Sequence, residues 1–308
     1  MEINTLGAVL KYYREKYGIA QDNLCDGICT QAMLSKIEHG NKVVDSLVAE
    51  SLLGRIGKTV FQFELLSNDE DYVLWKLREE IKKAEQRDDY IQMELLLEKY
   101  YEKMPSKVVH KQFYLYYTAK CKSFHGVSNE IICEMLYDAI LLTKSDVDER
   151  DIFLCNPTEI GILLLLYRYS FSKWIKKDVE KELLKILVQV ENMYSGRLKQ
   201  ETEIQILLEL IAYEMKIDNY KSTEKYVDEA IEFLSQDRSL EHIAELHFIK
   251  AQMIEKLYNS GNEWDVKKHL CKRECLMAYY VFDIIEQQDK REELKKYCKE
   301  KLGWQITK

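Results

Sequence analysis

The sequence contains very little proline and glycine. Only 2 Pro and 11 Gly occur among its 308 residues, below the usual share of roughly 5% and 7%. Because β-rich and α/β folds use these two residues in hairpins and tight loops, their scarcity favours long helices joined by short turns. With 46% hydrophobic and 32% charged residues, the chain has enough apolar material for a core. We therefore expect an all-α protein.

Long apolar runs and paired cysteines are also missing. No stretch of about 18 apolar residues occurs, and the first residues show neither the regions nor the cleavage site of a signal peptide. The eight cysteines form no CxxC pair, so neither a disulfide framework nor a zinc site of the usual spacing is indicated. These absences predict a cytoplasmic protein with free thiols and no membrane partner.

Sequence signatures of common enzyme classes do not occur. GxGxxG, GxxxxGK[ST] and GxSxG are absent, and His242 and His247 stand five apart, which excludes the HExxH zinc arrangement. His269, Cys271 and Cys275 lie close together, but no second pair of ligands accompanies them, and we interpret the cysteines as helix-packing thiols. The sequence predicts no enzyme, no cofactor and no metal site.

The chain divides into two segments of different pattern. Residues 1–66 are typical of short helices separated by turns, with breaks at Gly18, Gly27 and Gly40. Two short helices joined by a Gly-containing turn, near residues 21–26 and 30–39, have the layout of a helix-turn-helix DNA-binding domain. We therefore predict a DNA-binding domain with a linker helix over residues 1–66.

Residues 67–308 show long amphipathic helices in pairs at intervals of roughly 40 residues, which indicates a helical repeat array. At one well-marked break, Asn156-Pro157 with Glu159 three residues past the cap predicts a helix start. Stacked pairs leave a concave surface suited to an extended peptide or a partner helix. The predicted pairs are 69–87 with 89–103, 107–125 with 128–144, 157–171 with 176–194, 199–216 with 219–236 and 238–258 with 264–286, followed by a helix at 289–302.

Five motif elements of the first segment resemble the Cro/repressor-type (XRE) helix-turn-helix. They are Leu6-Gly7, Arg14, Gly18-Ile19-Ala20-Gln21 and, in the third helix, Ser35-Lys36-Ile37-Glu38 followed by His39-Gly40. Two features depart from the pattern, because Leu24-Cys25 stands where Leu-Ala is usual and the loop after the third helix lacks a Pro. In this fold an Arg at position 14 often pairs with the Glu of the third helix, so the resemblance predicts a structural Arg14–Glu38 ion pair.

The combination with degenerate tetratricopeptide (TPR) pairs resembles the RRNPP family of peptide-pheromone receptors, and within it the PlcR-type regulators. The resemblance implies a quorum-sensing transcription factor, a homodimer that binds operator DNA and whose repeats bind a short signalling peptide. Residues 1–66 have seven Lys and Arg against eight Asp and Glu, a net charge of −1, which leaves −7 of the total −8 on the repeats. A near-neutral DNA-binding domain predicts dependence on dimerisation and two half-sites.

The DNA-binding candidates lie on one side of the third helix and at its flanks. Gln can pair with adenine, Lys can reach guanine or phosphate, and Ala can contact a thymine methyl group. Met33, Leu34 and Ile37 occupy the opposite side, and Gln21 opens the second helix, where a phosphate contact is expected. The alternative is that these are solvated polar residues of a small bundle. The candidates are Gln21, Thr30, Gln31, Ala32, Ser35, Lys36 and Lys42.

The peptide-binding candidates are polar or aromatic residues within two apolar helices of the repeats. A polar residue amid an apolar helix costs stability unless it is satisfied, which makes it a ligand candidate. Family members commonly hold the peptide with Asn side chains, and these two helices contain none. Two alternatives stay open: a TPR scaffold that regulates a protein partner, or a peptide-independent repressor that uses the repeats to dimerise. The candidates are Tyr167, Arg168, Gln205, Glu209 and Tyr213.

Overall fold

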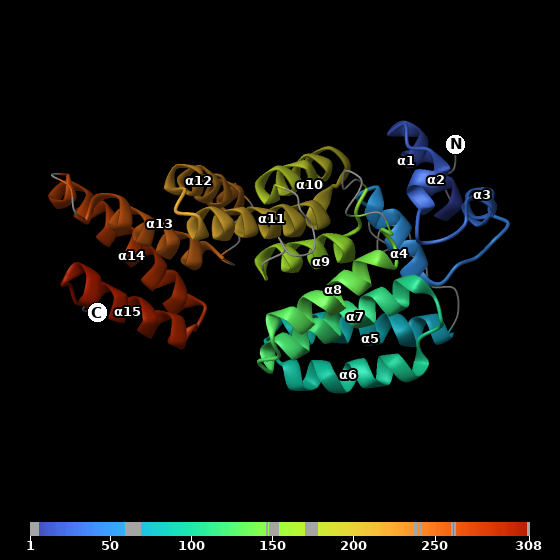
Figure 1. Ribbon diagram of the computed structural model, residues 1–308, viewed down its shortest axis with the longest axis horizontal. Helices are drawn as coiled ribbons and strands as arrows, with labels where there is room; N and C mark the ends of the chain where they lie inside the picture. The colour runs from blue at the N-terminus through green and yellow to red at the C-terminus, as the bar shows by residue number, and fades with distance from the viewer. Residues whose placement is uncertain are drawn as a thin grey trace. The chain divides into compact units, whose positions relative to one another are not determined.

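The predicted fold class is confirmed: the protein is all-helical (Figure 1). The computed structural model describes residues 6–58, 69–145, 147, 154–169, 178–236, 240, 242–259, 261 and 263–306, and these contain fifteen α-helices and no strand. The chain divides into two compact units, Met1–Glu203 and Ile204–Lys308. The domain boundary predicted at residue 66 does not coincide with the boundary between these two units, and the predicted division by function stays a prediction.

Four short helices begin the first unit. They are α1 (Leu6–Lys16), α2 (Gln21–Cys25), α3 (Gln31–Glu38) and α4 (Ser46–Arg55). Helices α1 and α2 both pack on α3, and α4 contacts α1 and α2. Gly7 allows α1 to approach α3 closely, because a Cβ at this position would lie 1.9 Å from the carbonyl oxygen of Ile37. The Leu6-Gly7 element of the motif therefore has a packing role.

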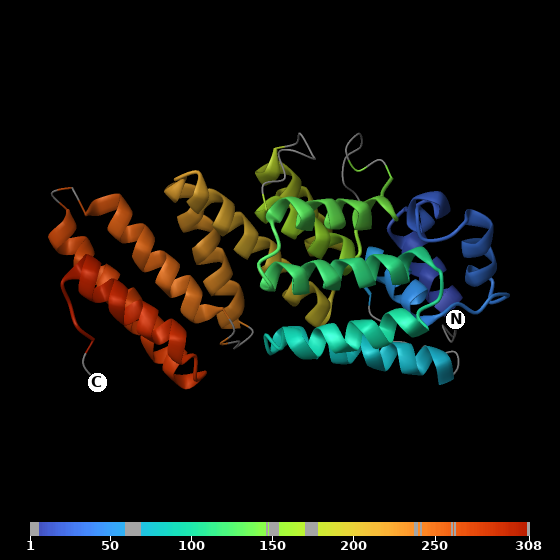
Figure 2. The same ribbon diagram turned by 60° about the horizontal axis from the view of Figure 1, so that its bottom comes forward.

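The repeat helices of the first unit follow the short-helix bundle along the chain. Their bounds agree with the predicted ones to within a few residues, and Figures 1 and 2 both show α5 to α8 side by side. Consecutive helices from α5 to α9 pack on one another. These helices are α5 (Asp69–Gln86), α6 (Tyr90–Lys103), α7 (Val108–Phe124), α8 (Asn129–Leu141), α9 (Pro157–Arg168) and α10 (Val179–Met193).

Helix α4 joins the short-helix bundle to the repeats. It contacts α5, α7 and α9 as well as α1 and α2, and nine of its ten residues are buried. Gly54 leaves room for the start of α9, since a Cβ there would lie 2.8 Å from Cδ of Pro157. Gly57 has φ +67°, and a Cβ on it would lie 2.3 Å from the carbonyl oxygen of Met193 at the end of α10. The bundle is thus packed against the repeats rather than tethered to them.

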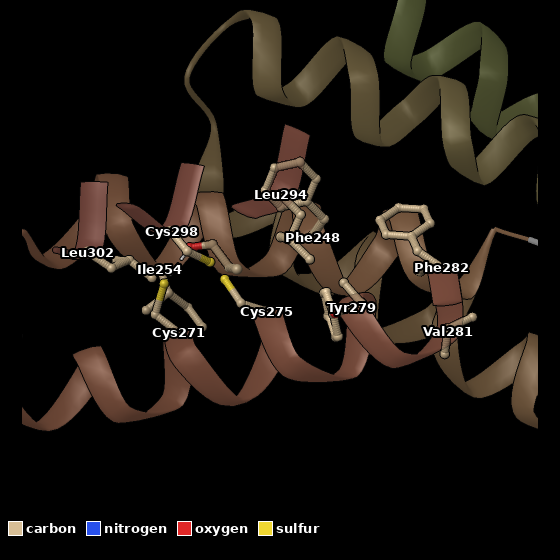
Figure 3. Packing of buried hydrophobic residues seen from close by; sticks show 13 residues of the cluster. Phe248, Ile254, Cys271, Cys275, Tyr279, Val281, Phe282, Leu294, Cys298 and Leu302 are labelled. Atoms are coloured by element: carbon tan, nitrogen blue, oxygen red, sulfur yellow. Dashed lines mark hydrogen bonds between the residues drawn. The ribbon is translucent and has the colours of Figure 1, made fainter. Parts of the chain in front are cut away.

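The second unit contains the end of α11 (Gly196–Lys216), followed by α12 (Tyr220–Gln236), α13 (Ile243–Tyr258), α14 (Trp264–Ile284) and α15 (Gln288–Leu302). Each helix from α12 onward packs on the next. Its core includes three buried thiols of α14 and α15, Cys271, Cys275 and Cys298, beside Phe248 and Phe282 (Figure 3). All eight cysteines are free, as predicted.

Among the described residues, no helix is both long and apolar enough to cross a membrane. Within the same part of the chain, no group of three or more His, Cys, Asp and Glu side chains is arranged to hold a metal ion.

Candidate nucleic-acid interface

Helix α3 presents most of the predicted DNA-binding residues on one exposed face. Its inner face is fixed by Leu34 and Ile37, which are 0% and 1% exposed. Thr30 caps the helix, because its Oγ1 accepts a hydrogen bond from the backbone N–H of Met33 at 3.2 Å. Gln31, Ala32 and Lys36 are exposed together with Thr30, and Ser35 is half-buried. Exposed side chains at this spacing can reach base edges when such a helix enters a major groove.

The orientation of α3 is fixed by a charge network at its end. Arg14 donates from Nε to Oε1 of Glu38 at 2.6 Å and from Nη2 to Oε2 at 2.9 Å. The predicted Arg14–Glu38 ion pair is therefore confirmed, and it is bidentate. Nη1 of Arg14 also donates to the carbonyl oxygen of Ile19 at 3.1 Å. The hydrogen bond to Glu38 is the main reason that the pKa of Arg14 is raised. The network holds α1, the start of α2 and α3 together.

Gln21 belongs to the same network, a contact that the sequence reasoning missed. Its Nε2 donates to Oε2 of Glu38 at 2.8 Å. Glu38 is 5% exposed and accepts from two side chains, so Gln21 helps to satisfy a buried carboxylate. Both residues belong to the Cro/repressor-type motif, and this motif is the sequence signal from which their contact could have been predicted. A phosphate contact by Gln21 stays a prediction.

The loop after α3 carries the exposed Lys42 and ends at Asp45, which contacts the repeat helix α7. Asp45 caps α4, with Oδ1 accepting from the backbone N–H of Val48 at 3.1 Å. The buried ring of His110 on α7 lies with Nε2 2.9 Å from Asp45 Oδ1, and Lys107 pairs with the other carboxylate oxygen. The end of the loop that presents Lys42 is thereby anchored on α7.

A second anchor holds the turn of the helix-turn-helix. Nη1 of the buried Arg55 donates to the carbonyl oxygens of Leu24 at 2.9 Å and Asp26 at 2.6 Å. Its Nη2 donates to Oε1 of Glu159 on α9 at 2.8 Å. Sequence reasoning identified Glu159 only as a capping residue, which it is, and missed its pairing with Arg55. The only local sign of this pair in the sequence is Arg55 itself, a charged residue in the otherwise apolar stretch Leu52 to Ile56.

The peptide-binding candidates lie on α9 and α11, and the two sets belong to different units. On α9, Tyr167 is buried and Arg168 is exposed. Burial, followed by the charge of Glu182, raises the pKa of Tyr167, so this phenol stays neutral. The candidates on α11 stand at successive intervals of four residues and differ in burial: Gln205 is exposed, Glu209 is buried and Tyr213 is half-buried. Their binding role stays a prediction.

Comparison with solved structures identifies the fold. PlcR from Bacillus thuringiensis "in complex with the peptide PapR7 and DNA" is 18% identical, and the match covers 94% of this chain and 99% of that one with a TM-score of 0.59. The apo form of PlcR matches at 16% identity, with coverage of 94% and 97% and a TM-score of 0.57. The apo form of the competence regulator ComR from Streptococcus vestibularis matches at 14%, with coverage of 96% and 97% and a TM-score of 0.52.

The chain has the fold of the RRNPP regulators. The resemblance that the sequence indicates is therefore confirmed at the level of the fold, over nearly the full length of both chains. No protein-family model and no curated protein matches the chain. At these low identities the likeness is carried by helix arrangement rather than by shared side chains.

Proposed function

We propose that this protein is a transcriptional regulator that binds operator DNA as a homodimer and responds to a short signalling peptide bound by its repeats. The observation that carries the proposal is the exposed row Gln31, Ala32 and Lys36 on a helix whose position is fixed by Glu38. Gln and Lys have the side-chain donors and acceptors that read base edges, and Ala can contact a thymine methyl group. The full-length likeness to PlcR bound to a peptide and DNA supports it.

In this proposal α3 enters the major groove, and Gln21 and Lys42 contact phosphates on either side. The charge of residues 1–66 is −1, so one domain gains little from nonspecific attraction to DNA. A homodimer joins two such domains and can read two half-sites. The ion pair between Arg55 and Glu159 would transmit a movement of the repeat helix α9 directly to the turn of the helix-turn-helix.

Peptide control is proposed to act through linkage. A peptide that prefers one arrangement of the dimer shifts DNA affinity by the same factor by which DNA shifts peptide affinity. Tyr167 and Arg168 on α9, with Gln205, Glu209 and Tyr213 on α11, are the proposed peptide contacts. Their Tyr, Gln and Glu side chains can hydrogen-bond an extended peptide backbone, and their mixed burial gives both apolar and polar contacts.

Two titrations of the full chain test this function. Gel shifts with the promoter of the protein's own gene should give a specific complex that a scrambled duplex of equal length does not compete away. Calorimetry with the mature tail of a secreted peptide encoded next to the gene should show binding, with an affinity that changes when promoter DNA is present.

The outcomes separate the proposed regulator from its alternatives. DNA binding that no peptide changes would support a peptide-independent repressor. Absence of both DNA and peptide binding would support a scaffold for a protein partner and would overturn the proposal.

A further inference from the structure

Helix α14 carries a row of large apolar side chains on the face that points away from its own core. Val266, Met277, Tyr280 and Ile284 are 75%, 46%, 57% and 66% exposed. The opposite face packs into the core of the second unit through residues such as Cys271, Cys275 and Phe282 (Figure 3). Single exposed apolar residues are ordinary, but a contiguous row on one helix is typical of a contact surface.

The spacing of this row is that of a coiled-coil seam. With the half-buried Leu270 and the exposed Arg273, its members follow one another at intervals of four, three, four, three and four residues. That interval pattern is the a and d repeat by which two helices pack along their length. At 1.5 Å per residue the seam is about 27 Å long. It consists of Val266, Leu270, Arg273, Met277, Tyr280 and Ile284, and we call this set the α14 seam.

We infer that the α14 seam is a homodimer surface, which packs antiparallel on the α14 seam of a second copy. The inference rests on the proposed function insofar as two half-sites require two copies. A two-fold axis beside Cys275 places Val266 opposite Ile284 of the second copy and Leu270 opposite Tyr280. The same axis places Arg273 opposite Met277, so every member of the seam has a partner within it.

The charged member of the seam decides the direction of packing. In a parallel pair Arg273 would face Arg273 of the second copy, and two guanidinium groups would repel each other in an apolar contact. In the antiparallel pair the two Arg273 side chains are offset by about 6 Å along the helices. Each lies opposite Met277, with Tyr280 of the second copy one step along the seam, where its planar group can stack on the phenol ring. Its side chain is 67% exposed, and only Nη2 is used in the bond to Glu274 at 2.8 Å.

The edge of the seam adds a second complementary pair. His269 and Asp283 flank the seam on the same side of α14, near its two ends, and both are exposed, although Asp283 also pairs with Arg291 of α15 in its own chain. Antiparallel packing about this axis brings His269 beside the Asp283–Arg291 pair of the second copy, once at each end of the same edge of the dimer. A surface that matches itself in apolar, aromatic and charged positions fits a second copy of this chain better than an unrelated helix.

Substitution of Met277 tests both the surface and its direction. Met277→Lys places an ammonium group opposite Arg273 of the second copy at two symmetric positions, whereas Met277→Glu places a carboxylate there. In sedimentation of the full chain without DNA or peptide, we expect wild type and Met277→Glu to be dimers and Met277→Lys to have half their mass. Ile91→Lys is the matched control, because Ile91 is 69% exposed on α6 of the first unit. A dimeric Met277→Lys protein would overturn the inference, as would equal loss of the dimer in both variants.

Crosslinking tests the register. Val266→Cys and Ile284→Cys chains should form a disulfide-linked dimer when mixed and oxidised, identified by mass spectrometry of the linked peptides. Either variant alone should not form that bond, because two Val266 positions would lie about 27 Å apart. Linkage within each single variant at the same rate as in the mixture would contradict the register.

The tests of the α14 seam and the tests of the proposed function can fail independently of each other. If wild type binds promoter DNA and Met277→Lys is still a dimer, only the α14 seam is wrong. If the α14 seam forms the dimer but no promoter DNA is bound, only the proposed function is wrong.

Discussion

The guanidinium of Arg55 and the carboxylate of Glu159 form a fully buried ion pair, with Nη2 2.8 Å from Oε1. The other oxygen of Glu159 accepts the backbone N–H of Asn156 at 2.8 Å and completes the capping box of α9. Arg55 also holds the carbonyl oxygens of Leu24 and Asp26. One carboxylate thus links the start of a repeat helix to the turn of the helix-turn-helix.

Glu159→Gln should destabilise the protein strongly. The substitution leaves the buried charge of Arg55 without a counter-charge, and breaking a buried pair in this way costs about 3–5 kcal/mol. Urea denaturation at pH 7, followed by circular dichroism, measures the loss. Glu94→Gln on the exposed side of α6 is the control and should change the free energy of unfolding by less than about 0.5 kcal/mol. A loss below about 1 kcal/mol for Glu159→Gln would contradict the assignment.

The same pair predicts a pH dependence. Burial alone would raise the pKa of Glu159, but Arg55 and Lys144 outweigh it and lower the pKa below its ordinary value. A carboxylate with a lowered pKa in the folded state stabilises the fold above its unfolded pKa of about 4.3, and this contribution is lost as the pH falls through the folded value. The stability gap between wild type and Glu159→Gln should therefore persist from pH 8 to 5 and narrow only below about pH 4. A gap that closes between pH 8 and pH 5 in urea titrations would contradict this.

Gly7→Ala should displace α3. The new Cβ would lie 1.9 Å from a backbone oxygen, that of Ile37, so the helix itself has to move. We expect a loss of roughly 3 kcal/mol in stability, at the upper end for overpacking, together with a loss of DNA affinity. Gly18→Ala is the control, because Gly18 has φ +66° with nothing within 4 Å and should cost only about 1–2 kcal/mol. Thermal unfolding and fluorescence anisotropy with promoter DNA compare the two. An unchanged melting temperature in Gly7→Ala would show that α1 and α3 do not approach this closely.

The helices of this protein could be predicted from its sequence because their signals are local. Apolar periodicity defined the long pairs, and the caps at Thr30 and Asn156 act within three residues. The Arg14–Glu38 ion pair could be predicted because both residues belong to the helix-turn-helix motif. The Arg55–Glu159 ion pair could not be predicted, because the two residues are 104 positions apart and neither belongs to a sequence motif that indicates its partner.

The two predicted sites differ in how far the sequence could describe them. The exposed face of α3 follows from periodicity, since Leu34 and Ile37 must point inward. On α11 the same reasoning marks polar residues without saying which are exposed, and Gln205 is exposed while Glu209 is buried. The local sequence pattern does not determine which of these positions is buried. The α14 seam likewise becomes visible only when the buried face of α14 is known.

Cys29 should be almost inert despite its partial exposure. Burial first, and then the neighbouring Cys25, raise the pKa of its thiol from 9.0 to about 12. Because the thiolate is the nucleophile, three pKa units lower the reactive fraction about a thousandfold at pH 8. Timed alkylation of native protein with iodoacetamide, read by peptide mass spectrometry, should label Cys29 far more slowly than the unfolded chain. Labelling of Cys29 at the rate of a free thiol would contradict this environment.

Substitutions on and beside α3 should separate base reading from phosphate contact. Gln31→Ala removes a side chain that can pair with a base edge, so it should weaken promoter binding by about 1–3 kcal/mol, roughly 5- to 150-fold, and leave scrambled DNA binding unchanged. Lys42→Ala removes a proposed phosphate contact, so it should weaken binding to both duplexes and reduce the slope of log affinity against log salt by roughly 0.9 per contact. Lys83→Ala, at an exposed position on α5, is the charge-matched control. Anisotropy titrations at several salt concentrations measure all three variants. If Gln31→Ala weakened both duplexes equally, α3 would not be the helix that reads the operator.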